Sequence, residues 1–280
     1  MAALSVLRAE VQLRMRDATG RVMTNANTDA LINNALEEWV NATEEIRQEN
    51  AYAMTAYQFD YAAPSDLIKL IKAYWAPTRT ELEVVGLNEL IDNGGAWTQA
   101  GTPQYLALEG TEAALRFRIW PAPPSASGAN QLDGSINSTV TTLTLDSTAN
   151  FRGPSGWVLV ESEKILYQNM SSTTMTVARR GMGQTTAATH ADNVAVTACD
   201  LHVWYAREAT ALSADGDVPE INARWHKALV YKALAMGMLL EGRHDEAAAN
   251  EELFFKYLDE AKVAIRRAQA SAPIDMRSAY

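Results

Sequence analysis

Cysteine is almost absent from this sequence: Cys199 is the only one in 280 residues. A single thiol excludes an internal disulfide framework, and it excludes a metal site built only from the cysteines of one chain. The sequence therefore fits a reducing compartment.

Long apolar runs are absent as well. Charged residues recur from Arg8 to Asp17, so a signal peptide is not expected at the start of the chain. The most apolar helical segment, residues 225–240, is interrupted by His226 and Lys232 and is too polar to span a bilayer. We therefore expect no membrane partner.

Positive charge is scarce, because 24 Lys and Arg residues stand against 34 Asp and Glu residues and give a net charge of -10. Tight wrapping of nucleic acid needs clustered Lys and Arg, so the composition argues against it. The charge remains compatible with a protein that DNA slides past, because an acidic surface repels phosphate and prevents sticking.

The sequence also lacks a recognisable set of catalytic residues, so we expect no enzyme, no cofactor and no bound metal. Gly181 and Gly183 lie in a glycine-rich stretch that lacks the Lys-Ser/Thr pair and the helix start of a phosphate-binding loop, which favours a turn between strands. His190 and Asp192 supply only two of the ligands that a metal needs. Cys199 has no basic neighbour in the sequence that would activate its thiol. The other histidines lie in no nucleophile or metal motif: His202, His226 and His244.

The middle of the chain differs from both flanks. Residues 125–198 are rich in Thr, Ser, Gly and Val and show no helical periodicity. Short strands are predicted at residues 139–145, 157–160, 165–168, 174–178 and 193–197. Several short strands at this spacing are typical of a small sandwich or barrel. This segment is called the insert below.

The flanks predict helices at both ends of the chain. Leu4, Leu7, Val11 and Met15 share one face of a first helix that ends near residue 20. A second helix is expected to begin after the N-cap pair at residues 27–28 and to carry an apolar stripe as far as Ile46. Two closing helices, with stripes over residues 225–240 and 254–268, predict an antiparallel pair.

Strands are predicted between these helices, at residues 57–61, 67–75, 81–85, 104–109 and 114–120. The last two indicate a hairpin. Residues 201–207 predict a strand after the insert, and we expect it to pair with residues 114–120. The two ends of the insert should then lie close together.

The resulting fold class is α+β: a helical frame with an antiparallel β-sheet and an inserted small all-β domain, sandwich or barrel-like. The predicted domains are residues 1–124 together with 199–280 for the frame, and residues 125–198 for the insert.

The last residues, 270–280, lack periodicity and are predicted to order only on assembly. Apolar side chains on a loose tail gain free energy when a partner buries them. The predicted partner-binding residues are Pro273, Ile274, Met276 and Tyr280.

Two groups of segments resemble known phage proteins. The frame, over residues 4–120 and 201–268, resembles the head-to-tail adaptor proteins of short-tailed bacteriophages. The order and spacing of five segments carry this resemblance: residues 29–39, 59–66, 101–105, 118–123 and 217–230. The insert, through residues 143–151, 163–167 and 177–190, is similar to a β module found in many phage structural proteins.

The resemblance implies a structural role. It implies a homo-oligomeric ring, a dodecamer, that joins the portal protein to the tail nozzle and surrounds the DNA exit channel in the neck of the virion. The DNA would pass without sequence-specific binding, and the ring would assemble in the host cytoplasm. The insert would dock tail or fibre proteins.

Two other classes of function stay open at this stage. The first is a carbohydrate-binding or adhesin-type virion protein, for which the insert offers three aromatic residues, Phe151, Trp157 and Tyr167. The second is an enzyme whose site is assembled from distant parts of the chain.

Overall fold

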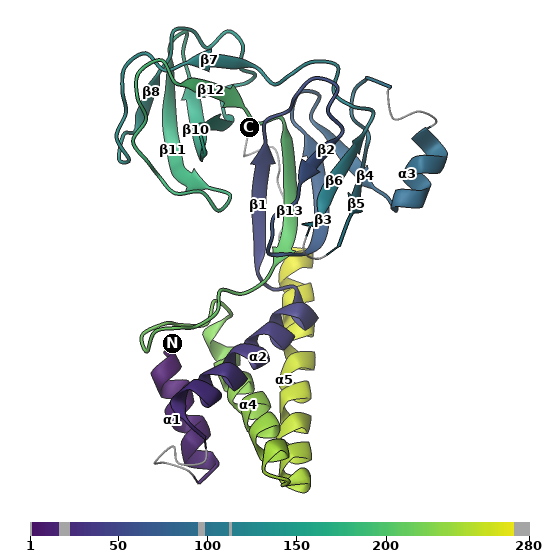
Figure 1. Cartoon of the computed structure of the whole chain (residues 1–280), viewed down its shortest axis with the longest axis vertical. Helices are drawn as coiled ribbons and strands as arrows, with labels where there is room; N and C mark the ends of the chain where they lie inside the picture. Colours follow the sequence, from purple (N-terminus) through teal and green to yellow (C-terminus); the bar gives the residue numbers. More distant parts are fainter. Residues whose placement is uncertain (1, 17–22, 95–98, 112–113, 272–280) are drawn as a thin grey trace. The chain divides into compact units, whose positions relative to one another are not determined.

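A computed structural model of the protein describes residues 2–16, 23–94, 99–111 and 114–271. It divides into two compact units, and Figure 1 shows the elements of each. The helical unit takes the chain up to Arg47 and again from Ala206, and the β unit takes residues Gln48–Tyr205. Helix and sheet are both present in quantity, which confirms a mixed α and β fold. The two compact units divide at residues 47/48 and 205/206. The domain boundaries expected at residues 124 and 199 stay a prediction.

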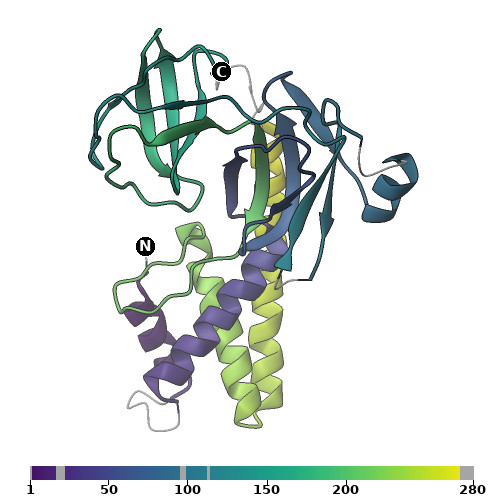
Figure 2. The same ribbon diagram turned by 45° about the horizontal axis from the view of Figure 1, so that its top comes forward.

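Within the described residues, five elements build the helical unit. They are α1 (Leu4–Arg14), α2 (Asn25–Thr43), the 3-10 turn η2 (Ala223–Trp225), α4 (His226–Leu240) and α5 (His244–Ser271). Figure 2 shows α4 and α5 as an antiparallel pair, as predicted. In the described ranges we find no helix with the length and apolarity that a membrane crossing requires.

The ends of α2 differ from the prediction. Thr24 is the N-cap, since its side chain accepts a hydrogen bond from the Asn27 amide, so the helix begins earlier than expected. Thr28 lies inside the helix and is buried. At the other end Glu44 adopts a left-handed conformation with φ 51° and stops the helix, which leaves Ile46 outside it.

Aromatic rings fill the core of the helical unit. Trp39 of α2 is fully buried, and its ring lies 5.9 Å from that of Trp225 and 6.0 Å from that of Phe254 on α5. Helix α4 is buried along most of its length, and its one buried lysine, Lys232, reaches carboxylates at 2.9 Å and 3.0 Å. These contacts hold α2, α4 and α5 together.

The larger of the two sheets has seven strands in the order β1-β13-β3-β4-β5-β6-β2. The strands are β1 (Arg47–Tyr52), β2 (Asp60–Ala62), β3 (Leu67–Trp75), β4 (Thr80–Val84), β5 (Tyr105–Glu109), β6 (Arg116–Trp120) and β13 (Leu201–Arg207). The β5–β6 hairpin is antiparallel, as predicted. However, β4 and β5 run parallel, so the sheet is mixed and the expected antiparallel sheet is wrong. A parallel pair needs a crossover, and helix α3 (Leu87–Gly94) lies in that connection.

The pairing expected across the insert is also wrong. Strand β13 lies between β1 and β3, whereas β6 lies between β5 and β2. Strand β1 begins at Arg47, directly after the residues that were expected to end α2, because the left-handed Glu44 turns the chain out of the helix.

The two ends of the insert nevertheless meet. The Ser127 hydroxyl donates a hydrogen bond to Asp200 Oδ2 at 2.7 Å, and the Ala198 amide donates to the Gly128 carbonyl at 2.7 Å. The chain therefore leaves and rejoins the region of the seven-stranded sheet at one place.

The smaller sheet is formed entirely by the insert, in the order β7-β12-β9-β10-β11-β8. Its strands are β7 (Ala129–Gln131), β8 (Thr142–Thr144), β9 (Gly156–Val160), β10 (Glu163–Met170), β11 (Thr174–Met182) and β12 (Ala195–Ala198). Strand β7 was not predicted, and β11 runs through Gly181, which was expected in a turn. Apolar side chains from five of these strands and from the loops between them form a core of its own.

The two sheets of the β unit contact each other. Trp157 of β9 is buried together with Ala51 of β1 and Cys199. The Lys164 ammonium donates a hydrogen bond to the Asn50 side chain, and the Gln184 amide donates to Asp66. The insert therefore packs on the seven-stranded sheet through both apolar and polar contacts.

Candidate functional site

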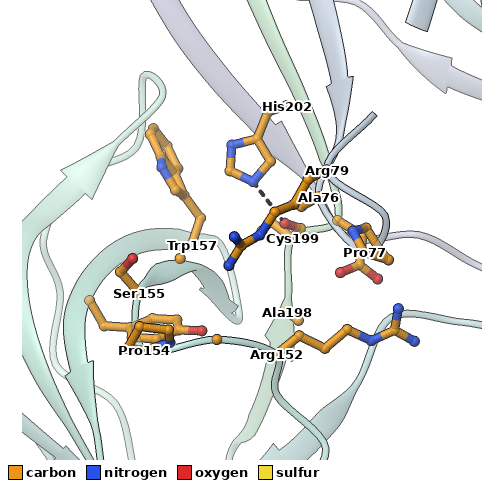
Figure 3. Close-up of a pocket in the computed structure, with 14 residues that line it drawn as sticks. Ala76, Pro77, Arg79, Arg152, Pro154, Ser155, Trp157, Ala198, Cys199 and His202 are labelled. Carbon is orange, nitrogen blue, oxygen red and sulfur yellow. Dashed lines mark hydrogen bonds between the residues drawn. The ribbon is translucent and has the colours of Figure 1, made fainter. Parts of the chain in front are cut away.

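A cleft of about 180 Å³ lies within the β unit, where the insert meets the seven-stranded sheet (Figure 3). Three segments form its walls: the turn after β3, the loop that precedes β9, and the link between β12 and β13. The polar side chains that line it are Arg79, Arg152, Ser155, Tyr167, Asp200 and His202, with Cys199 beside them.

The cysteine and histidine of this cleft are engaged in structure. Burial raises the pKa of the Cys199 thiol to about 12, so the thiol is protonated near neutral pH and is a poor nucleophile. His202 lies against acceptors on both sides: Nε2 donates to the Cys199 carbonyl at 3.1 Å, and Nδ1 lies 2.9 Å from Glu49 Oε1. The imidazole therefore has no free nitrogen with which to act as a base on the thiol.

The two arginines of the cleft do not converge. In Figure 3 the Arg79 side chain extends toward Trp157, and the Arg152 side chain extends away from it. Asp200 accepts a hydrogen bond from Ser127 and is part of the junction that closes the insert. The cleft thus has a packed and hydrogen-bonded wall, and its charged groups do not surround a common ligand position.

A second polar cluster lies inside the insert and is built around Glu163. The Glu163 side chain is fully buried and accepts two hydrogen bonds from Arg180, each at 2.6 Å. It also accepts hydrogen bonds from the Gly181 and Ala188 amides and lies 2.8 Å from His190 Nε2. The other ring nitrogen of His190, Nδ1, lies 2.7 Å from the exposed Glu161.

This cluster fixes the loop between β11 and β12. Arg180 also donates to two backbone carbonyls, those of Asn137 and Ala188. Both nitrogens of His190 lie against carboxylate oxygens, those of Glu161 and Glu163. Because Arg180 occupies the carboxylate of Glu163, the cluster is an ion network; among the residues that the structure describes, no group of histidines, cysteines and carboxylates could hold a metal.

The stability of the insert should therefore fall at low pH. Burial alone would raise the pKa of Glu163, but the hydrogen bonds from Arg180, the Ala188 amide and His190 outweigh burial and lower the pKa from 4.5 to about 2. The stabilisation is complete above the unfolded-state pKa near 4.5 and is lost as the pH falls from there toward 2. Denaturant unfolding gives the free energy of unfolding of the wild type and of Glu163→Gln at pH 6, 4 and 3, and the difference between the two proteins should become smaller at each lower pH. A difference that stays constant with pH would contradict the lowered pKa of Glu163.

The residues that were considered as candidate site residues in the sequence have different structural roles. Gly181 lies in β11 with φ 62°, and an added Cβ there would lie 2.9 Å from the Ala187 nitrogen, so the glycine serves the close approach of two backbones. His190 belongs to the ion network and does not join Asp192, which binds the Gly134 amide. His226 is buried in the helical unit beside the Ile221 carbonyl. Of these residues, the structure brings only Gly181 and His190 together, because the Gly181 amide and His190 Nε2 both bind the carboxylate of Glu163.

The predicted partner-binding residues cannot be placed in this way. Pro273, Ile274, Met276 and Tyr280 lie outside the described residues, so their role stays a prediction. Helix α5 does continue to Ser271, which corrects the expected start of the tail at residue 270.

The ion network was missed in the sequence, although a signal for it exists. Glu163, Ile165 and Tyr167 alternate along β10, and all three are buried. The strand period of two places Glu163 on the same face as these apolar residues. A carboxylate on a buried face requires a cationic partner, and Arg180 on the neighbouring strand is in place to supply it.

Comparison with known proteins identifies the class. The sequence matches the SU10 adaptor protein family over residues 1–277, which is nearly the whole chain. No curated protein matches the sequence significantly. The chain belongs to the SU10 adaptor protein family, and the resemblance to phage head-to-tail adaptors is confirmed. Membership makes it a phage structural protein and a component of the virion.

Proposed function

We propose that this protein forms the adaptor ring between the portal and the tail nozzle, around the channel through which DNA leaves the head. The family match over residues 1–277 carries the proposal. The ring is a homo-oligomer, which we propose to be a dodecamer, and the insert docks nozzle or fibre proteins. Assembly takes place in the host cytoplasm.

Two properties of the chain support this function. The net charge of -10 suits a ring whose inner surface repels the DNA backbone, so that DNA passes without binding. Cys199 is buried, and His202, His190 and Glu163 are engaged in hydrogen bonds and ion pairs, as expected of residues that serve structure.

The alternative of a carbohydrate-binding protein gains no support from the insert. Sugar-binding surfaces present exposed aromatic rings, but Phe151, Trp157 and Tyr167 are 6%, 4% and 3% exposed. All three serve the packing of the insert and its contact with the seven-stranded sheet.

The direct test is co-assembly with the portal protein of the same phage. Purified portal rings and this protein are mixed, and the complex is measured by native mass spectrometry and electron microscopy. We expect a ring of adaptor subunits on one end of the portal, and addition of the nozzle protein should extend it. Failure to bind the portal would overturn the proposal.

The tail should strengthen this assembly. A chain truncated after Ser271 keeps all of α5 and is expected to bind the portal at least about tenfold more weakly, because burial of an apolar side chain contributes about 1.5–3 kcal/mol before ordering costs. A triple serine variant of Ile274, Met276 and Tyr280 should show the same loss. The control, Asp275→Ala with Arg277→Ala, should bind normally. Equal binding by all four proteins would leave the tail without a role in assembly.

A further inference from the structure

Lys164 of the insert contacts an asparagine of the seven-stranded sheet. It lies on β10, and its side-chain nitrogen Nζ donates a hydrogen bond to Asn50 Oδ1 on β1. The two residues are 114 positions apart in the sequence, and both belong to the β unit. An amine and a primary amide in contact are the two groups that an isopeptide bond joins.

The contact between these side chains is enclosed. Asn50 is 5% exposed. Gly183 lies against the pair, since a Cβ added there would be 2.5 Å from Asn50 Oδ1 and 3.3 Å from Lys164 Cδ. The ring of Tyr52 also lies against Lys164, with its centroid 4.8 Å from Nζ. These neighbours restrict the access of water and hold the amine beside the amide, and a reaction between two groups is accelerated when both are held in place.

The enclosed position makes the Lys164 amine a better nucleophile. Burial lowers the pKa of the Lys164 ammonium, because a site with little water disfavours the charged form. A larger share of the side chain is then neutral amine near neutral pH. The neutral amine has the electron pair that attacks a carbonyl carbon.

The amide of Asn50 is contacted at both of its polar atoms. The Ala51 backbone amide donates to Oδ1 at 2.9 Å, where negative charge develops when the carbonyl carbon is attacked. Nδ2 lies 3.4 Å from the hydroxyl oxygen of Tyr52. Burial raises the pKa of Tyr52, so the hydroxyl keeps its proton near neutral pH and can donate it to the departing nitrogen.

We propose that Lys164 and Asn50 join in an isopeptide bond that ties the insert covalently to the seven-stranded sheet. The neutral amine of Lys164 attacks Asn50 Cγ, and the carbonyl electron pair moves to Oδ1. The Tyr52 hydroxyl gives its proton to Nδ2 and recovers one from Nζ. The carbonyl then reforms, the Cγ–Nδ2 bond breaks and ammonia leaves. One C–N bond forms and one breaks, so the reaction requires no oxidant.

The bond changes how the insert is attached to the sheet. Hydrogen bonds and apolar contacts open and close again, whereas an isopeptide bond stays closed when the chain unfolds. Because the bond spans 114 positions of the sequence, it restricts the unfolded chain in the way that a disulfide does. Unlike a disulfide, it forms in a reducing compartment.

Intact-mass spectrometry of the purified full chain tests the bond. We expect the mass to be lower than the sequence mass, counted with or without Met1, by that of one ammonia molecule. Trypsin should release a branched peptide that joins residues 48–69 to residues 153–179, because Lys164 is no longer a cleavage site. A folded wild-type protein with the full sequence mass would overturn the proposal.

Two lysine variants assign the lost ammonia. Lys164→Arg keeps the positive charge but has no nucleophilic amine, so it should retain the full sequence mass. Lys256→Arg, at an exposed position of α5, is the matched control and should lose ammonia as the wild type does. An asparagine that closes on its own backbone also releases ammonia. Loss of ammonia from Lys164→Arg, or the lack of a branched peptide in the wild type, would identify that reaction and refute the isopeptide bond.

Tyr52→Phe tests the proton transfer. The variant keeps the ring beside Lys164 and removes the hydroxyl that faces Asn50 Nδ2. The bond should form about a hundredfold more slowly, since a positioned proton donor contributes about that factor. Intact mass is followed over time after cell-free synthesis, and circular dichroism confirms that the variant is folded. An unchanged rate would show that Tyr52 is not the proton donor.

Discussion

Replacing Trp39 by alanine is expected to lower the free energy of unfolding of the helical unit by about 3–5 kcal/mol. The Trp39 side chain is fully buried and touches the rings of Trp225 and Phe254, so truncation opens a cavity where three elements meet. Its indole nitrogen also donates to Glu45 at 3.1 Å, and this hydrogen bond would be lost. Denaturant unfolding followed by circular dichroism at a helix wavelength measures the effect.

Leu240→Ala is the matched control in the same unit. Leu240 is 77% exposed at the end of α4, so its truncation should change the free energy of unfolding by less than about 0.5 kcal/mol. If the two variants unfolded at the same denaturant concentration, Trp39 would not be the centre of this core.

The second large effect is expected at Glu163. Glu163→Gln keeps the size of the side chain but removes the charge that Arg180 and His190 face; the His190 side chain is buried and the Arg180 side chain is 9% exposed. Breaking a buried ion pair by removing one partner typically costs about 3–5 kcal/mol, since the remaining charge is left without compensation. The loss should appear in the unfolding of the insert, which native-state hydrogen exchange of its backbone amides reports.

Glu161→Gln provides the comparison, because both glutamates contact the same histidine. Glu161 is 57% exposed, and an exposed ion pair contributes at most about 1 kcal/mol. The free energy of unfolding should be highest for the wild type, slightly lower for Glu161→Gln and much lower for Glu163→Gln. The reverse order would show that burial does not govern the network.

The sequence predicted those parts of the fold that local periodicity determines. The closing helices, the strand at Leu67–Trp75 and the β5–β6 hairpin all carry regular apolar spacing, and the structure has each of them. Strand pairing was harder, because β13 contacts strands more than 100 residues away and no local pattern specifies its neighbours. The expected pairing of β6 with β13 was therefore wrong, although the pairing of β6 with β5 was predicted correctly.

Other features depend on single residues whose role is visible only in three dimensions. Glu44 stops α2 through a left-handed backbone conformation that a non-glycine residue seldom adopts, so the helix was extended too far and β1 was missed. The ion network around Glu163 needs Arg180, which is close in space through the pairing of β10 and β11.

The junction of Ser127 with Asp200 has a consequence for how this chain can change over time. Because the insert departs and returns through a gap that one hydrogen bond spans, its length does not alter the path of the strands on either side. A module of different size could replace it without disturbing the register of the seven-stranded sheet. The replacement would need to cover Ala51 and Cys199, which the insert now shields from water. The junction thus separates the insert, which can be exchanged, from the seven-stranded sheet, which has to be kept.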